Sequence, residues 1–265
     1  MQRKFKFKKK SQDITLKRFI PNMVTLSALC VGLTAIKFSL SGQLDFAILC
    51  LLFSAVLDAT DGRLARYMGV TSHFGAELDS LADFVNFGVS PAVIGYIVSL
   101  RMIGEFGWGV SLFFIICSGL RLARFNSTKF YQEKEEQVWE HDYSVGVPAP
   151  AGAICAVFPM ILALATENTG SISPLYLVIS FLFSGILMVS KIRTFVFKNF
   201  KITNSSVSLC VLLIGILVIC MMTKLWWTMV AISILYILSI PLSHKRYLKK
   251  LNSSDLSKDD KNISD

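Results

Sequence analysis

Residues 57–83 read LDATDGRLARYMGVTSHFGAELDSLAD and contain four aspartates, Asp58, Asp61, Asp79 and Asp83. The first two are three residues apart and the last two are four apart. Side chains at these intervals share one face of an α-helix, with Cβ atoms about 5–6 Å apart, so each pair of carboxylates points in one direction. We expect the two pairs to face each other and to form a group of four negative charges.

Long apolar runs surround this acidic stretch. The chain is 53% hydrophobic and has a mean hydropathy of +0.57, which is too apolar for an ordinary soluble domain. A run of about 20 residues crosses about 30 Å of hydrocarbon. The sequence therefore predicts an all-α integral membrane protein with eight spans, near residues 20–38, 43–60, 80–100, 108–126, 149–166, 173–190, 205–222 and 225–242.

The basic residues predict the orientation of these spans. Segments 1–19, 61–79, 121–148, 191–204 and 243–265 hold 24 of the 27 lysines and arginines. Cytoplasmic loops of membrane proteins collect such residues. We therefore expect a multi-pass protein of the cell (inner) membrane, with both termini and the acidic stretch on the cytoplasmic side.

The two ends of the chain are polar. Residues 1–19 combine a basic run with a short amphipathic stretch and are expected to contact anionic membrane lipids, or to act only as a topology signal. Residues 243–265 are expected to be a disordered cytoplasmic tail. Because the basic residues flank spans, the net charge of +9 does not indicate a nucleic-acid partner.

Four clustered carboxylates at a membrane boundary repel one another and require cations. The six cysteines form no CxxC pair and the three histidines form no HExxH pattern, so zinc is not indicated. Oxygen-only ligands predict hard divalent ions, Mg²⁺ or Mn²⁺, and two such ions can hold a diphosphate. Gly62 and Gly75 allow close backbone approach to a ligand, and Arg66 can bind a phosphate.

The pattern Asp58-x2-Asp61-Gly62-x2-Ala65-Arg66-x8-Gly75-x3-Asp79-x3-Asp83 resembles the signature of the CDP-alcohol phosphotransferases in every fixed position. The resemblance implies a homodimer with six core helices and two divalent ions. It implies that Asp58 and Asp79 bridge both ions, that Asp61 completes one, and that Asp83 completes the other and is the general base. Gly62, Arg66 and Gly75 would hold the CDP group.

Further segments resemble the phosphatidylserine synthase branch of that family: residues 21–25, 83–92, 118–126 and 146–151. Gly146-Val147-Pro148 departs mildly from the Gly-Leu-Pro that is frequent there. The resemblance implies transfer of a phosphatidyl group from CDP-diacylglycerol to L-serine, with release of CMP. It implies a core at 20–204, and leaves 205–242 as two additional transmembrane helices.

Four polar residues are candidates for binding serine. Arg121 and Arg124 are three residues apart and suit a bidentate grip on the serine carboxylate, although arginine is also common just outside a span. Asn86 and Asn126 could complete the pocket. Near the start of the first span, Asn22 and Thr25 could contact the CDP-lipid or only cap a helix.

Two alternatives remain open on the sequence alone. A sister enzyme would use another alcohol, such as glycerol phosphate, inositol phosphate or choline. A cation transporter would use the aspartates to bind the ion it moves, but the four acids lie at one membrane face and the midplane lacks a broken helix pair.

Overall fold

The computed structural model describes residues 19–70, 72–131, 143–190, 193–195, 204–241 and 243. The predicted segment 1–19, apart from Phe19, and nearly all of the predicted tail lie outside this part of the chain. The described elements are α1 (Phe19–Leu40), α2 (Leu44–Tyr67), α3 (His73–Phe84), η2 (Val85–Val89), α4 (Ser90–Val98), η3 (Leu100–Ile103), α5 (Gly104–Tyr131), β1 (Tyr143–Val145), α6 (Ala149–Ala165), η5 (Thr169–Ser171), α7 (Pro174–Val189), β2 (Arg193–Phe195), α8 (Asn204–Thr223) and a last helix, Leu225–Pro241.

The helices confirm the predicted all-α membrane fold. Phe19–Leu40, His73–Val98 and Leu100–Ser127 are long and apolar enough to cross a bilayer, and Ala149–Ala165, Pro174–Val189, Val211–Thr223 and Leu225–Pro241 are shorter apolar helices. Helix α2 occupies the second predicted span and carries acidic residues toward its end. The chain is therefore a multi-pass membrane protein.

One element was not predicted. Strands β1 and β2 form a short antiparallel pair in which Tyr143 is opposite Phe195 and Val145 is opposite Arg193. Both strands lie in segments predicted as cytoplasmic loops. The pair connects the segment before α6 to the segment after α7, and so ties these two loops together.

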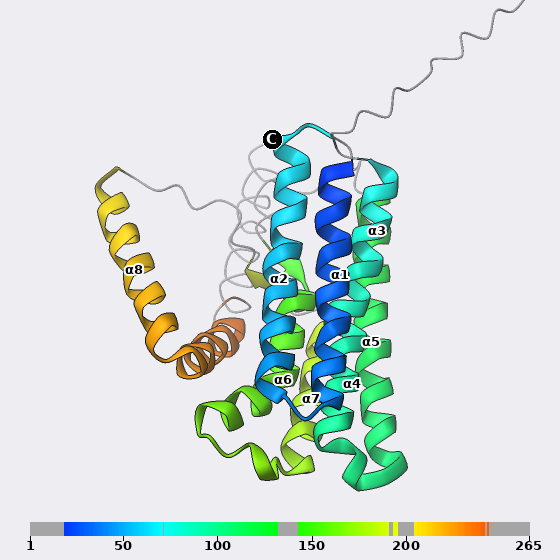
Figure 1. Ribbon diagram of the computed structural model, residues 1–265. Helices are drawn as coiled ribbons and strands as arrows, with labels where there is room; N and C mark the ends of the chain where they lie inside the picture. The colour runs from blue at the N-terminus through cyan, green and yellow to red at the C-terminus, as the bar shows by residue number, and fades with distance from the viewer. Residues whose placement is uncertain are drawn as a thin grey trace, which may run out of the picture.

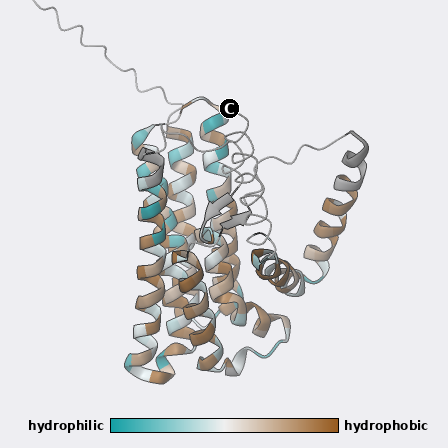
Figure 2. Cartoon of the chain, turned by 180° about the vertical axis from the view of Figure 1, so that it is seen from behind, coloured by the Kyte–Doolittle hydropathy of each residue, from teal (hydrophilic) through white to brown (hydrophobic). Residues whose placement is uncertain are grey.

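The bundle consists of α1 to α7, with the helices roughly side by side (Figure 1). Its core contains small side chains at helix contacts, such as Ala35 and Ala47, and rings such as Phe114 and Phe181, whose centroids are 5.1 Å apart. Large apolar side chains, among them Leu33, Phe53 and Ile116, are exposed on the outside. Hydrophobic residues cover most of the length of the bundle, and hydrophilic residues gather near the end where α2 stops and α3 starts (Figure 2). This pattern suits a lipid-facing surface.

Helices α2 and α3 present their acidic residues at the same end of the bundle. After α2 the chain turns at Gly69, whose φ is +62°, and re-enters as α3 at the N-cap Ser72. The Ser72 hydroxyl accepts a hydrogen bond from the Gly75 backbone N–H at 3.0 Å, which satisfies one of the free donors at the helix start. This short turn brings the acidic end of α2 next to α3.

The chain after Asp83 is π-helical rather than α-helical. In η2 the backbone N–H of Ser90 donates to the carbonyl of Val85, five residues earlier. Pro91 follows at once and has no N–H to donate, so the regular pattern is interrupted at this place. Such single-turn π-bulges are frequent at functional sites, and this one turns the buried Asn86 toward Gly32 of α1.

The last two helices lie outside the bundle of α1 to α7 (Figure 1). Every residue from 211 to 220 of α8 is exposed. The last helix, by contrast, packs against the bundle: Val230 joins the main core, and Ile240 contacts a second cluster with Val147 and Leu187.

Candidate functional site

Three of the four aspartates form a compact acidic group. Carboxylate oxygens of Asp58 and Asp61 on α2 and of Asp79 on α3 all lie within 4.8 Å of one another. Asp61 is only 3% exposed. Two helices thus contribute ligand atoms to one place, as the spacing of the acids in the sequence indicates.

Asp83 adjoins this group from one turn further along α3. Its carboxyl group lies within hydrogen-bonding range of Asp58. Two carboxylates at that separation cannot both be charged unless a proton or a cation lies between them. The four aspartates of the predicted motif are therefore close together in space.

The donor set fits divalent cations. Among the described residues, one oxygen of Asp61 and one of Asp83 are buried without a hydrogen-bond partner. Buried carboxylate oxygens without partners are costly, and a cation would satisfy them. Because all these ligand atoms are carboxylate oxygens, the group suits Mg²⁺ or Mn²⁺ better than zinc.

Thr25 connects α1 to the acidic group. Its hydroxyl donates a hydrogen bond to Oδ2 of Asp61 at 2.5 Å and also lies 3.2 Å from the carbonyl of Pro21. The Thr25 side chain is buried. Since only one oxygen of Asp61 is engaged in this bond, the other stays available for a ligand. Thr25 thus orients a carboxylate of the acidic group.

A cavity of about 240 Å³ adjoins the acidic group at the junction of α1, α2 and α3. Two of the aspartates, Asp61 and Asp79, lie in its wall. All five residues predicted to bind the CDP-lipid also line it: Asn22, Thr25, Gly62, Arg66 and Gly75. The structure therefore brings the carboxylates and these five residues to one concave site.

The two glycines of the motif differ in their surroundings. A Cβ at Gly75 would lie 2.9 Å from Oδ1 of Asn22, so α1 and α3 approach closely only because no side chain intervenes. A Cβ at Gly62 would have no atom of the described residues within 4 Å. Packing in this part of the chain therefore does not demand a glycine at Gly62, and its bare backbone lines the cavity, where a ligand could approach.

The residues predicted to bind serine occupy several positions. Arg121 on α5 is 8% exposed, interacts electrostatically with Asp83 and lies 5.4 Å from the centre of the Phe125 ring. Arg124 donates a hydrogen bond to the carbonyl of Val189 at 2.8 Å, at the C-terminal end of α7. Arg121 therefore lies beside the acidic group, and Arg124 contacts the end of a neighbouring helix.

The two asparagines also differ. Asn126 donates to the hydroxyl of Ser80 at 3.0 Å and so links α5 to α3. Asn86 is fully buried in η2, and neither atom of its amide group has a hydrogen-bond partner within the described part of the chain. A fully buried amide without partners is unusual, and its position three residues after Asp83 places it near the acidic group.

The site also contains residues that the sequence reasoning did not single out. Ser72 caps α3 and lines the cavity, and Val70 and Ala76 also lie in its wall. Ser72 could have been predicted from the sequence, because serine is a preferred N-cap residue immediately before a helix. The π-helical turn could not, because the sequence around it continues an apolar helical pattern.

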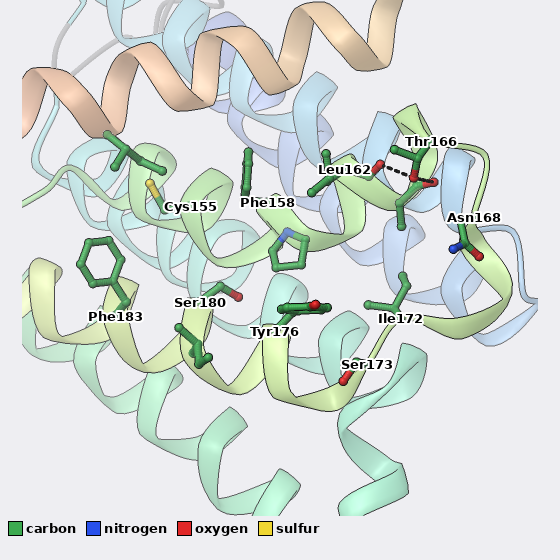
Figure 3. A pocket seen from close by; sticks show the side chains of 14 residues that line it. Cys155, Phe158, Leu162, Thr166, Asn168, Ile172, Ser173, Tyr176, Ser180 and Phe183 are labelled. Atoms are coloured by element: carbon green, nitrogen blue, oxygen red, sulfur yellow. Dashed lines mark hydrogen bonds between the residues drawn. The ribbon is translucent and has the colours of Figure 1, made fainter.

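A larger cavity, of about 600 Å³, lies elsewhere. It is bordered mainly by apolar side chains of α6 and α7, including Phe158, Leu162 and Phe183, with Ile237 of the last helix (Figure 3). It contains no acidic residue. Its size alone therefore does not make it the chemical site, and the smaller cavity beside the aspartates is the better candidate.

The acidic motif lies within a segment that matches a known protein family. A family model described as CDP-alcohol phosphatidyltransferase matches residues 18–196. Proteins named CDP-diacylglycerol–serine O-phosphatidyltransferase are similar: that of Mycobacterium tuberculosis is 43% identical over 53% of this chain and 48% of its own length. Two further relatives of this name align over more of their length. The protein of Helicobacter pylori is 35% identical over 73% of this chain and 78% of its own length. The protein of Bacillus subtilis is 34% identical over 69% of this chain and 92% of its own length.

The alignment spans about half the length of the mycobacterial relatives. The family model, however, covers well over half of the chain and includes the whole acidic motif. The chain belongs to the CDP-alcohol phosphatidyltransferase family.

Proposed function

We propose that this protein transfers the phosphatidyl group of CDP-diacylglycerol to the hydroxyl of L-serine, which yields phosphatidylserine and CMP. The observation that carries the proposal is the convergence of the aspartates with a cavity lined by Asn22, Gly62, Arg66 and Gly75. The names of the similar proteins support serine as the acceptor alcohol.

The aspartates would hold two divalent ions. Asp58 and Asp79 would contact both, Asp61 would complete one set of ligands and Asp83 the other. When bound, Mg²⁺ or Mn²⁺ would neutralise the diphosphate and stabilise the negative charge on the departing CMP. Thr25 would hold Asp61 in position through its hydrogen bond.

The cavity would bind the CDP group. Arg66 offers charge-assisted hydrogen bonds to phosphate oxygens, and Gly62 and Gly75 leave room for the ligand beside the backbone. Asn22 supplies an amide at the same wall, suited to hydrogen bonding with the nucleotide.

The reaction needs one proton transfer. The serine hydroxyl would give its proton to Asp83, whose Oδ1 has no partner among the described residues. The serine oxygen then forms a bond with the β-phosphorus, which carries the diacylglycerol, and the bond from that phosphorus to the CMP oxygen breaks with its electron pair. Arg121, beside Asp83, would bind the serine carboxylate, with Arg124, Asn86 and Asn126 as further candidates.

The proposal also includes the domain organisation, the oligomeric state and the membrane location of the enzyme. Residues 20–204 would form the catalytic core, and 205–242 the additional helices. The protein would be a homodimer in the inner membrane with its acidic site toward the cytoplasm, in agreement with the distribution of lysine and arginine.

A product assay tests the function. The purified protein in vesicles that contain CDP-diacylglycerol should release CMP and form phosphatidylserine when L-serine and Mg²⁺ or Mn²⁺ are present, and a chelator should stop the reaction. Glycerol phosphate, inositol phosphate and choline serve as competing acceptors. Faster turnover with one of these would assign the chain to a sister activity, and no metal-dependent CMP release with any alcohol would refute the proposal.

A further inference from the structure

The last helix lies outside the segment matched by the family model, yet it packs against the bundle. Its residue Tyr236 packs against the cluster of Val147, Leu187 and Ile240. This cluster joins the last helix to the segment before α6 and to the end of α7.

The hydroxyl of Tyr236 is buried and lacks a hydrogen-bond partner among the described residues. A buried tyrosine hydroxyl ordinarily has a partner, because an unsatisfied polar group in an apolar environment costs free energy. The ring is held by apolar contacts, so the hydroxyl is fixed in a place where the described residues give it nothing to bind. This arrangement suits a bound ligand that accepts a hydrogen bond from the hydroxyl.

The neighbours of the hydroxyl indicate which ligand this is. Tyr236 lies within electrostatic range of the guanidinium of Arg121, and Arg121 in turn interacts with Asp83. Within the described part of the chain, the other group with such an interaction is the thiol of Cys155 on α6. A phenol O–H and a guanidinium are both hydrogen-bond donors, and a pair of such donors suits a carboxylate.

We propose that Tyr236 determines specificity for the acceptor alcohol, because its hydroxyl donates a hydrogen bond to the carboxylate that Arg121 binds. The inference rests on the proposed function, in which the acceptor carries a carboxylate. It gives the last helix a role at the site, through the hydroxyl of Tyr236.

Tyr236→Phe tests the inference, since it removes the hydroxyl and keeps the ring that packs against Val147 and Leu187. We expect the KM for serine to rise about tenfold or more, as for the loss of one hydrogen bond to a charged group. The KM for CDP-diacylglycerol should stay unchanged. The thermal unfolding temperature in detergent should not fall, because the lost hydroxyl has no partner within the described protein.

Tyr176→Phe is the matched control. Tyr176 lies on α7, is 64% exposed and borders the larger apolar cavity (Figure 3), so all three quantities should stay at their wild-type values.

The outcomes separate the inference from the proposed function. If the wild-type protein releases no CMP with serine, the proposed function is refuted, whatever the variant does. Wild-type activity with an unchanged serine KM in Tyr236→Phe would overturn the inference alone. A lower unfolding temperature together with a general loss of rate would also overturn it, because Tyr236 would then be a structural residue.

Discussion

Replacing Thr25 by valine removes one oxygen and keeps the shape of the side chain. In the structure this hydroxyl donates to Oδ2 of Asp61 at 2.5 Å, in a place where both residues are buried. The side-chain donor to Asp61 in this part of the chain is the Thr25 hydroxyl, and the backbone N–H of Gly62 adds a weaker contact. Without the hydroxyl, the carboxylate would be free to rotate away from the position in which it faces the other aspartates.

The expected effect follows from the kind of bond. A hydrogen bond to a charged group contributes about 1.5–3 kcal/mol, and loss of a partner that orients a metal ligand typically weakens metal binding by about 10–100-fold. We therefore expect the Mg²⁺ concentration for half-maximal CMP release, measured at saturating CDP-diacylglycerol, to rise by about that factor. The KM for CDP-diacylglycerol at saturating Mg²⁺ should change much less.

Thr34→Val is the matched control, because Thr34 is an exposed threonine of the same helix whose hydroxyl bonds to the carbonyl of Cys30 at 2.7 Å. It should leave both quantities unchanged. An unaltered Mg²⁺ requirement in Thr25→Val would refute the role of Thr25 in orienting Asp61. A raised KM for CDP-diacylglycerol at saturating Mg²⁺ would instead indicate that Thr25 contacts the nucleotide.

The remaining predictions concern the acids, the arginines and the topology. Asp58→Asn and Asp79→Asn should abolish CMP release. Asp83→Asn should also abolish it, but this variant should retain more binding of labelled CDP-diacylglycerol, because a base is needed only when the hydroxyl attacks. Near-normal rates in all three variants would exclude the two-ion site. Arg121→Lys should raise the serine KM by on the order of tenfold, since lysine lacks the paired donors of arginine, and a silent substitution would leave Arg121 with a topological role only. Arg124→Lys should act chiefly on thermal stability, measured as the unfolding temperature, because Arg124 holds the carbonyl of Val189. An impermeant thiol reagent added from outside should label a cysteine placed at Gly170 and miss one placed at Ser144, and the reverse pattern would invert the proposed orientation.

Much of the architecture was predictable because a membrane restricts the choices open to a chain. In hydrocarbon every backbone polar group must find its partner within the protein, so a long apolar run can only be a helix. The predicted spans accordingly coincide with helices such as α1, α5 and α7. The β1–β2 pair was not predictable, because it depends on two loops meeting after the bundle has formed.

The acidic group was also partly predictable from the sequence. Spacings of three and four residues place Asp58 with Asp61, and Asp79 with Asp83, on common helix faces. The sequence could not say that Thr25, on another helix, would bond to Asp61, because that contact depends on how α1 packs against α2. Nor could it separate Arg121 from Arg124: they are three residues apart, yet one faces Asp83 and the other the end of α7.

Local spacing along the chain thus determined the helices, the acidic pairs and the kind of ion that these pairs suit, because helix geometry repeats every few residues and carboxylate chemistry belongs to the side chain itself. Only the tertiary structure decided which residues from distant segments share the site. The cavity joins α1, α2 and α3, and Tyr236 comes within electrostatic range of Arg121 from a helix more than a hundred residues further along the chain. Such contacts depend on how whole helices pack, and the free energy of packing is a sum over many side chains that no short motif contains.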